Sequence, residues 1–459
     1  MYVGTPVGSS YELLYTDPDR TADIRRAPRA GLLYPSEGNT VAMRTEAFWV
    51  MDDDDEGLAA DLGLGLGAEP ARVLAYLLRR DVDDRIEEPR ARVLEIRLGT
   101  GLGRQPAIDA LSALAERGLV AESTLDSQQG RPPKAWSAEG TVETAIRRAY
   151  EERADRLVSA LSTDAATGTA GEPPSPGDPF RVGFNWLPNG LQVPFYAART
   201  ADAYGTTRLD VEFVHHRGSR AALEAVAAGA VDVGVVGAAT LTSAIQRGVA
   251  IEPLAVLYQR AMAVLYTTRA AFGGPLTGSE QLRGRRIGLS PDTETRLLAE
   301  VFLSQAGVAD DVEILETDGE EVEALRSGRA DVVAGSFSDP WRLDGEADVE
   351  TLAIAEQFPI YGPVLAVDPE AVAPDRLRRF LAATMLGWRA GRADPTPAAG
   401  RIAAESDADP DEIERTFRTA LSSFADSKAS RTDGWGAHGE DEWERLRIAL
   451  ARTGRLETA

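Results

Sequence analysis

The stretch FNWLPNGLQVPFYAART, residues 184–200, decides how the larger part of this chain folds. Its first residues complete an apolar segment, RVGFNW, that is typical of a short strand, and VPFYAARTADAY has the apolar spacing of a helix. Between them lies a turn rich in proline, asparagine and glycine. Ligands in α/β domains bind where strands end and helices begin, because the first N–H groups of a helix lack partners within it. Trp186, Asn189, Gln192 and Tyr196 are therefore candidate ligand-binding residues.

The same alternation of strand and helix continues through the C-terminal part of the chain. The segments LDVEFVH, VDVGVVG, RRIGLS, VEILET and ADVVAGSF are short and apolar, and segments with helical periodicity separate them. Such alternation predicts mostly parallel strands covered by helices. Because the strands form two series, we expect a two-lobed α/β domain over residues 180–459.

Three further strand-to-helix turns carry residues that suit a small ligand. A flat apolar ligand fits between aromatic rings, while amides, hydroxyls and carboxylates bond its edge. Core packing explains each aromatic residue better when it is taken alone, but the aromatic residues taken as a set favour a ligand. The candidates outside the first turn are Thr240, Glu294, Asp339, Trp341 and Tyr361.

Residues 57–140 have a different pattern, which predicts an α+β winged helix-turn-helix. Two helical segments precede a glycine break, and RQPAIDALSALAERGLV then has helical spacing before two short strands joined by a Gly-Arg-Pro tip. The Arg-Gln-Pro helix start and the GRPPKAW wing resemble those of winged-helix transcriptional regulators. A winged helix that contacts only protein is the alternative. On the DNA-binding interpretation, the third helix presents Arg104, Gln105, Asp109 and Ser112 to base edges, and the wing presents Arg131 and Lys134 to phosphates.

Three other segments complete the predicted organisation. Residues 1–56 lack periodicity over most of their length, so we interpret them as a disordered extension or as the product of a start codon called too early. The start codon is then Met1, Met43 or Met51. Residues 141–161 form an amphipathic helix, either for dimerisation or for packing on the winged helix. The Pro/Gly-rich stretch 162–179 is predicted to be a linker.

The composition is strongly acidic, with a net charge of −24. Among the 49 basic residues only Lys134 and Lys428 are lysines. Acidic, lysine-poor surfaces suit an extreme halophile, because such surfaces stay hydrated in concentrated salt. Cysteine is absent, which excludes disulfides, thiol catalysis and cysteine metal sites. We find neither an export signal nor a stretch apolar enough to span a bilayer, so we expect a cytoplasmic protein that does not contact the membrane.

A resemblance to a known family covers the chain from Arg181 to Leu456. NWLPNGLQVPFYAA followed by LDVEF is similar to the opening of thiamine-pyrimidine-precursor binding proteins, as are AAGAVDVGVVGAATL, FPIYGPVLAV and GWGAHGEDEW. The resemblance implies the two-lobed periplasmic-binding-protein fold and a pyrimidine ligand such as hydroxymethylpyrimidine or formylaminopyrimidine. Related synthases need an active-site histidine and a lysine that carries pyridoxal phosphate. Here Gln192 replaces the family's histidine, and neither lysine lies in a pocket turn. We therefore expect no enzymatic activity, no cofactor and no metal.

Together these features predict a ligand-responsive transcriptional regulator. A pyrimidine would bind the two-lobed domain, and a homodimer would bind a double-stranded DNA operator that controls thiamine synthesis or uptake genes. Two alternatives stay open: the same architecture that senses an alkylsulfonate, taurine or nitrate, and the solute-binding receptor of an ABC transporter. The operator sequence, the choice between activation and repression, and the sign of the ligand's effect also stay open.

Overall fold

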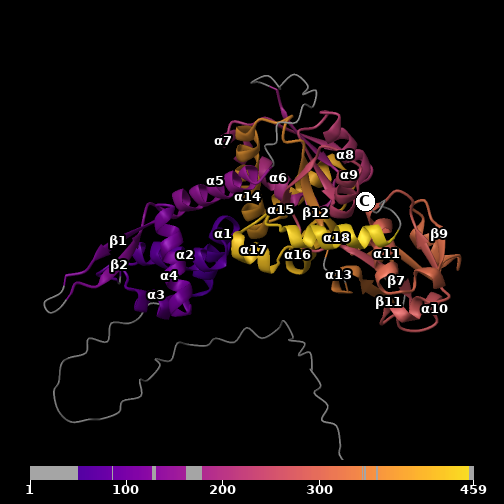
Figure 1. Ribbon diagram of the computed structural model, residues 1–459, viewed down its shortest axis with the longest axis horizontal. Coiled ribbons are helices and arrows are strands. Elements are labelled where there is room, and N and C mark those ends of the chain that lie inside the picture. Colours follow the sequence, from indigo (N-terminus) through magenta and orange to yellow (C-terminus); the bar gives the residue numbers. More distant parts are fainter. Residues whose placement is uncertain are drawn as a thin grey trace, which may run out of the picture. The chain divides into compact units, whose positions relative to one another are not determined.

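The computed structural model describes residues 50–84, 86–126, 131–161, 178–343, 345, 348–357 and 360–453 (Figure 1). The predicted extension up to residue 49 and the predicted linker over 162–177 lie outside the described residues. Among the residues that are described, no helix combines the length and the apolar character needed to cross a bilayer.

The N-terminal part of the described chain consists of helices followed by a β-hairpin. Asp52 caps the first helix by accepting hydrogen bonds from the N–H groups of Asp54 and Asp55. Gly101, with φ of 73°, ends the third helix in the left-handed conformation that glycine adopts without strain. The elements are α1 (Asp53–Leu66), α2 (Ala68–Val82), α3 (Val93–Thr100), α4 (Arg104–Glu116), β1 (Val120–Thr124), β2 (Lys134–Ala138) and α5 (Val142–Ser159).

Helix α4 packs on α2 and α3, and the hairpin follows it directly. Ala107, Ala110, Leu111 and Leu114 form the buried side of α4. Strands β1 and β2 are antiparallel, with Val120 opposite Ala138 and Thr124 opposite Lys134. Helix, turn, helix and hairpin thus follow one another over residues 93–138.

The first lobe of the C-terminal part has a five-stranded sheet in the order β4-β3-β5-β12-β6. Strand β3 is parallel to β4 and β5, whereas β12 is antiparallel to β5 and β6. Its strands are β3 (Phe180–Phe184), β4 (Val211–His215), β5 (Val233–Gly237), β6 (Glu252–Val256) and β12 (Pro363–Val367). Its first helices are η1 (Gly190–Gln192), α6 (Val193–Thr200), α7 (Ala203–Thr206), α8 (Ser219–Ala227) and α9 (Ala238–Gln246).

The second lobe has another five-stranded sheet, in the order β11-β7-β10-β8-β9. Its strands are β7 (Ala263–Thr268), β8 (Arg286–Leu289), β9 (Glu313–Glu316), β10 (Val332–Ser336) and β11 (Val349–Ala353). Its helices are α10 (Arg269–Phe272), η2 (Ser279–Leu282), α11 (Glu294–Gln305), η3 (Ala309–Asp311), α12 (Glu321–Arg326), η4 (Asp339–Leu343) and α13 (Ile354–Gln357).

The expected two-lobed α/β architecture with mostly parallel strands is present, although one strand of each sheet, β12 in the first lobe and β7 in the second, runs antiparallel to both of its neighbours. The chain passes from the first lobe to the second before β7, and it returns before β12. Both strands that follow a crossing run antiparallel to their neighbours. The sequence did not predict these two reversed strands, because short apolar strands do not reveal the direction in which the chain re-enters a sheet.

The two crossing segments, 257–262 and 354–362, lie side by side where they are described. The N–H of Ala261 donates to the carbonyl of Ile360 (2.7 Å), and the N–H of Gly362 donates to the carbonyl of Tyr258 (3.0 Å). A side chain at residue 362 would meet the carbonyl oxygen of Arg260 at 2.5 Å, so only glycine allows this close approach. The two lobes are therefore joined by paired segments rather than by a single linker.

Helices after the second crossing return to the first lobe and reach beyond it. Helix α14 packs on both α6 and α5, and α18 packs on α9 of the first lobe and on α11 of the second. The last helix of the chain thus touches both lobes (Figure 1). These helices are α14 (Pro374–Ala393), α15 (Thr396–Glu405), α16 (Pro410–Phe424), α17 (Lys428–Asp433) and α18 (Glu440–Arg452).

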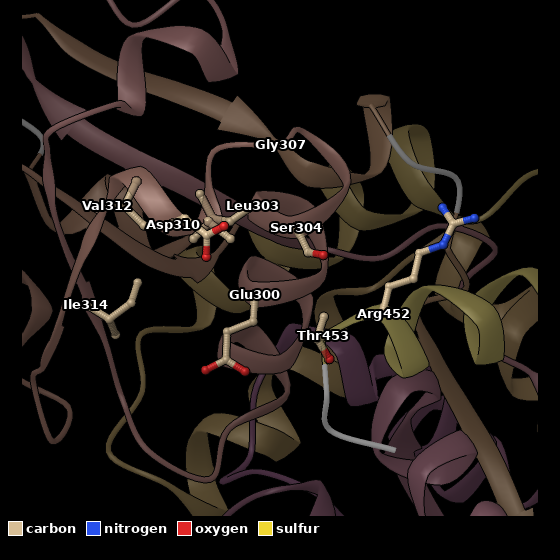
Figure 2. A pocket seen from close by; sticks show the side chains of 10 residues that line it. Glu300, Leu303, Ser304, Gly307, Asp310, Val312, Ile314, Arg452 and Thr453 are labelled. Carbon is tan, nitrogen blue, oxygen red and sulfur yellow. The ribbon is translucent and has the colours of Figure 1, made fainter. Parts of the chain in front are cut away.

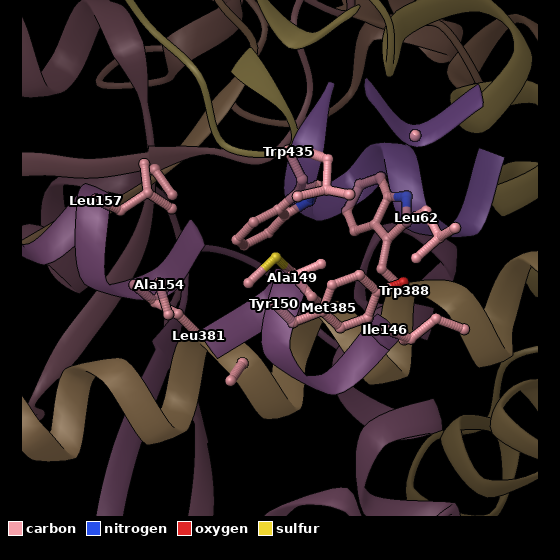
Figure 3. Packing of buried hydrophobic residues seen from close by; sticks show 14 of the residues in the cluster. Leu62, Ile146, Ala149, Tyr150, Ala154, Leu157, Leu381, Met385, Trp388 and Trp435 are labelled. Carbon is pink, nitrogen blue, oxygen red and sulfur yellow. The ribbon is translucent and has the colours of Figure 1, made fainter. Parts of the chain in front are cut away.

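A continuous apolar core joins the N-terminal helices to the first lobe. Helix α5 lies between α1 and α14, and its buried residues meet side chains from both (Figure 3). Polar contacts reinforce this packing: the Tyr150 hydroxyl donates to the carbonyl of Asp61 (2.9 Å), and the Arg389 guanidinium pairs with the Asp61 carboxylate (2.8 Å). The core residues shown in Figure 3 include Leu62, Ile146, Ala149, Tyr150, Ala154, Leu157, Leu381, Met385, Trp388 and Trp435.

Two features of this region differ from the expected organisation. Helix α1 begins at Asp53, inside the range 1–56 that we interpreted as an extension. The apolar side of α5, which we assigned either to dimerisation or to packing on the winged helix, is covered by α1 and α14 of the same chain. Helical periodicity identifies an apolar face but not its partner, and here the partner comes from the same chain.

The closest approach of α1 to α5 gives a test of this packing. A Cβ added at Gly65 would meet the carbonyl oxygen of Ala149 at 2.5 Å, whereas one added at Gly63 would meet only the Ala71 side chain, at 3.9 Å. We expect Gly65→Ala to lower the free energy of unfolding by about 1–3 kcal/mol through overpacking. Gly63→Ala is the matched control and should be neutral or stabilising by up to about 1 kcal/mol. Urea unfolding measures both, and equal stabilities of the two variants would contradict this account.

Candidate functional site

The turn after β3 leaves the Trp186 ring exposed, and the side chains of Gln192 and Asn189 hold the backbone of this turn in place. The Trp186 side chain is 52% exposed, while Gln192 is buried. Gln192 Nε2 donates to the carbonyls of Trp186 (3.3 Å) and Leu187 (3.2 Å). Asn189 donates to the carbonyl of Leu187 (2.8 Å) and accepts from the N–H of Leu191 (2.9 Å). Asn189 and Gln192 therefore shape the turn, and Trp186 is the residue that it presents.

Tyr196 lies beneath the same turn and is fully buried. Its hydroxyl donates to the Glu405 carboxylate (2.9 Å) and lies 3.3 Å from Nε2 of His215. Burial and the hydrogen bond to Glu405 raise the pKa of Tyr196, and burial lowers the pKa of His215. Nδ1 of His215 lies 2.8 Å from the carbonyl oxygen of Trp186, so this nitrogen carries a proton. Tyr196 thus supports the turn through His215.

Thr240 and Glu294 come together although they belong to different lobes. The Glu294 carboxylate accepts hydrogen bonds from the N–H of Ala239 (2.8 Å), the N–H of Thr240 (2.9 Å) and the hydroxyl of Thr240 (2.5 Å). Burial raises the pKa of Glu294, and these donors oppose the increase. A carboxylate of the second lobe therefore caps helix α9 of the first.

Asp339 and Trp341 lie together in the turn after β10. The Asp339 carboxylate accepts from the N–H of Ser336 (2.7 Å), and burial raises its pKa. The Trp341 ring packs edge-on against Phe337, and the Arg415 guanidinium lies 3.9 Å from the centre of the Trp341 ring. Because Arg415 belongs to α16, Trp341 forms a second contact between the lobes.

Tyr361 lies apart from the other ligand candidates. Its hydroxyl accepts from the N–H of Gly439 (3.0 Å), and its ring packs on Trp443 at 5.1 Å. Residues 434–439, which we call the C-terminal loop, join this region to the N-terminal helices. The N–H of Trp435 donates to the carbonyl of Leu64 (2.8 Å), and Arg153 Nε of α5 donates to the carbonyl of Trp435 (2.7 Å).

The structure therefore places the nine ligand candidates in four groups. Trp186, Asn189, Gln192 and Tyr196 share one turn, Thr240 contacts Glu294, Asp339 neighbours Trp341, and Tyr361 contacts the C-terminal loop.

Two surface hollows lie away from these groups. One, of about 460 Å³, lies between α11, η3 and the end of α18 (Figure 2). The other, of about 530 Å³, lies between α9 and α18 and includes Ile245 and Trp443. None of the nine ligand candidates lines either hollow.

The sequence did not indicate several polar residues at these turns. Ser219 begins α8 and accepts from the N–H of Gly237 (2.9 Å) and from Nδ2 of Asn185 (3.1 Å). Its place directly after a glycine turn, at a helix start, was the available signal. His215 and Arg415 gave no comparable signal, because their partners are distant in sequence. Among the residues that the structure describes, no three histidine, aspartate or glutamate side chains are placed to hold a metal ion.

The six residues predicted to contact DNA are all exposed. Gln105 also donates to the Asp109 carboxylate (2.7 Å), and Lys134 pairs with Glu122 across the hairpin (2.6 Å). On α4, Gln105, Asp109 and Ser112 occupy the side away from Ala107 and Leu111, and Arg104 is exposed at the start of the helix. The six residues are Arg104, Gln105, Asp109, Ser112, Arg131 and Lys134.

Comparisons with known proteins address the C-terminal part. Residues 189–398 match the family model described as NMT1/THI5 like. No curated protein matches the chain.

Solved structures that are similar to part of the chain include two sulfonate-binding proteins and a yeast gene product. The alkanesulfonate-binding protein SsuA from Xanthomonas axonopodis pv. citri, bound to MOPS, is 16% identical, with a TM-score of 0.45 and coverage of 63% of this chain and 96% of that one. The periplasmic aliphatic sulphonate binding protein SsuA from Escherichia coli is 14% identical, with a TM-score of 0.47 and coverage of 62% and 90%. The Candida albicans CA3427 gene product, described as having the generic periplasmic binding protein fold, is 14% identical, with a TM-score of 0.48 and coverage of 61% and 92%.

The partly buried histidine of the C-terminal loop predicts a pH dependence. Burial lowers the pKa of His438 to about 4, from an ordinary value of 6.5. Between these values the unfolded chain binds a proton that the folded chain does not, so the free energy of unfolding should fall as the pH falls from about 6.5 to about 4. We expect His438→Gln to lose less stability than the wild type between pH 7 and pH 5 in urea unfolding. Burial also lowers the pKa of His216, but by less, so His216→Gln should reduce the pH dependence less than His438→Gln does. An unchanged pH dependence in His438→Gln would contradict this assignment.

The C-terminal part is thus a two-lobed α/β domain, and residues 189–398 within it match the NMT1/THI5 like family model.

Proposed function

We propose that this protein is a ligand-responsive transcriptional regulator. Its two-lobed domain binds a small molecule, and residues 57–140 act as a winged helix-turn-helix that binds a DNA operator. By family resemblance, the ligand is a thiamine pyrimidine precursor such as hydroxymethylpyrimidine or formylaminopyrimidine, and the targets are thiamine synthesis or uptake genes. The domain match supports the ligand-binding part of this proposal only.

One observation carries the link between the two activities: the C-terminal loop contacts both the crossing segments and the N-terminal helices. Gln259, in the first crossing segment, donates to the carbonyl of Ala437 (3.0 Å), and Tyr361, in the second, accepts from Gly439. In the same loop, Trp435 bonds to Leu64 of α1 and to Arg153 of α5. A change in lobe closure bends the crossing segments and therefore acts on this loop.

The exposed side of α4 supports the DNA-binding part. Arg104 and Gln105 lie in the first turn of the helix, where side chains can reach base edges in a major groove. Residues 57–140 contain 11 basic and 13 acidic residues, a net charge of −2, so most of the chain's charge of −24 lies elsewhere. Repulsion between DNA and this unit is therefore much weaker than the charge of the whole chain suggests.

Three further predictions belong to this proposal. We propose that the protein is cytoplasmic and that its acidic, lysine-poor composition reflects the concentrated salt of an extreme halophile. We also propose a homodimer, since paired half-sites suit winged-helix readers. Because α1 and α14 cover the apolar side of α5, that side is not free for the dimer contact, which must use another surface.

A solute-binding receptor of an ABC transporter is the second candidate function. The family match fits this function more directly than it fits a regulator, because it covers only the two-lobed domain. The two candidates differ in what the N-terminal helices and hairpin do: a receptor has no need of an operator. An alkylsulfonate, taurine or nitrate is the alternative ligand under either function.

Ligand binding is tested by thermal unfolding of the full chain with hydroxymethylpyrimidine, formylaminopyrimidine, taurine and nitrate. A ligand at about 100 times its dissociation constant adds about 2.7 kcal/mol of stability. We expect stabilisation by a pyrimidine, and we expect Trp186→Ala to abolish it, because the exposed ring supplies a stacking surface. Ile448→Ala, which truncates an exposed apolar residue on α18, is the control. If only taurine or nitrate stabilises the protein, the proposed pyrimidine ligand is wrong. If a pyrimidine stabilises Trp186→Ala as much as the wild type, Trp186 does not contribute to the site.

DNA binding is tested by selecting duplexes from a random pool with the wild-type protein. We expect an operator to emerge, and we expect Arg104→Ala to weaken its binding by about 1–3 kcal/mol through loss of a base contact. Lys134→Ala should lower the affinity for all duplexes by a similar factor, because it removes a contact to phosphate, which is the same in every sequence. Arg247→Ala removes the same charge from an exposed site after α9 and should leave the affinity unchanged. If no duplex is selected, the receptor function is favoured.

A further inference from the structure

The Glu294 carboxylate occupies the N-terminus of a helix that belongs to the opposite lobe. Helix α9 runs from Ala238 to Gln246, and the N–H groups of Ala239 and Thr240 in its first turn both donate to this carboxylate. The Thr240 hydroxyl donates to it as well. Unpaired N–H groups and the helix dipole make such a helix start favourable for an anion. In this protein the anion is a side chain of the protein itself.

The residue before α9 is adapted to this contact. A Cβ added to Gly237 would collide with the carboxyl group of Glu294. The N–H of Gly237 donates to the hydroxyl of Ser219, so it takes no part in holding the carboxylate. The space that a side chain at residue 237 would fill thus accommodates Glu294, and the donors of Ala239 and Thr240 surround its oxygens.

Among the residues that the structure describes, no basic side chain shares in holding Glu294. Within the described part of the chain, the carboxylate forms no ion pair, and the groups that lower its pKa are the donors of Ala239 and Thr240 alone. Arg220, in the first turn of the neighbouring helix α8, is itself paired with Glu224 (3.0 Å) and with Asp292 of the second lobe (3.8 Å). A ligand anion at this position would therefore meet donors already in use and a negative charge beside them.

We infer that Glu294 is a specificity-determining residue, whose carboxylate takes the place of a ligand anion at the start of α9 and restricts the space between the lobes to neutral or cationic ligands. This inference rests on the proposed function in one respect, that a small molecule binds between the lobes. It excludes sulfonates and nitrate as ligands of the wild-type protein. It favours molecules that donate hydrogen bonds, such as aminopyrimidines, because the turns of the second lobe also present the Asp339 carboxylate.

Removal of Glu294 should convert the start of α9 into an anion site. In Glu294→Ala, the N–H groups of Ala239 and Thr240 and the Thr240 hydroxyl lose their acceptor, while Gly237 keeps the position open. We expect the variant to bind methanesulfonate at least about tenfold more tightly than the wild type, since one charge-assisted hydrogen bond already contributes about 1.4 kcal/mol or more. The measurement is thermal unfolding of the full chain in sodium methanesulfonate against an equal concentration of sodium chloride.

Asp292→Ala is the matched control. It removes a carboxylate only two residues away, and with it the contact to Arg220 of the first lobe, but it leaves the start of α9 occupied. We expect no gain of methanesulfonate binding in this variant. An equal gain in methanesulfonate affinity in Asp292→Ala and Glu294→Ala would overturn the inference. The loss of any one nearby negative charge would then explain the gain.

The remaining outcomes separate this inference from the proposed function. Glu294→Gln serves if the alanine variant does not fold, and it should give a smaller gain in the same direction, because it keeps the side chain but removes its charge. Wild-type protein that binds methanesulfonate as tightly as the variants, or folded variants that gain no binding, would overturn the role of Glu294. Hydroxymethylpyrimidine is tested on the wild type in the same series, and its failure to bind would count against the proposed ligand rather than against Glu294.

Discussion

The arrangement of this protein depends on the packing of α5 between α1 and α14. The contact is close enough that Gly65 of α1 lies directly against the backbone of Ala149. It buries Tyr150, Trp388 and Trp435 in one core with the first lobe, so the N-terminal helices are part of the same packed structure and not a separately tethered unit. The C-terminal loop can then bond to α1, α5 and both crossing segments at once. Without this core, a change between the lobes would have no rigid element through which to reach α4 and the hairpin.

Contacts between the lobes form a second constraint, and they differ in chemistry at each point. Glu294 binds the start of α9 through hydrogen bonds, Trp341 lies under Arg415, and Phe337 packs on Phe424 at 5.0 Å. These contacts link the turns of the second lobe to α9 and α16, on the side of the first lobe. They hold the lobes together through the protein's own side chains, so a ligand must be compatible with them or displace them. The carboxylate at α9 makes the ligand's charge the first property on which the domain discriminates.

Much of the local structure was predictable, and much of the site was not. Strand and helix segments such as RVGFNW and VPFYAART were identified because burial imposes period 2 or 3.6 on the apolar residues. The turns that carry Trp186, Thr240, Glu294 and Asp339 followed from the same pattern. The roles of these residues did not follow: Tyr196 is buried beneath its turn, and Glu294 caps a helix of the other lobe. Their partners, Glu405 and Ala239, lie far away in the sequence, where no periodicity connects them.

The sequence by itself determined the succession of helices and strands, the division of the C-terminal part into two series and the residue types at the strand ends, because these depend on local spacing and turn chemistry. The tertiary structure decided which strands run antiparallel after each crossing, which surface covers α5 and which donors hold Glu294. These outcomes depend on contacts between segments that are distant along the chain, and on close approaches such as that at Gly237, which only the packed structure creates.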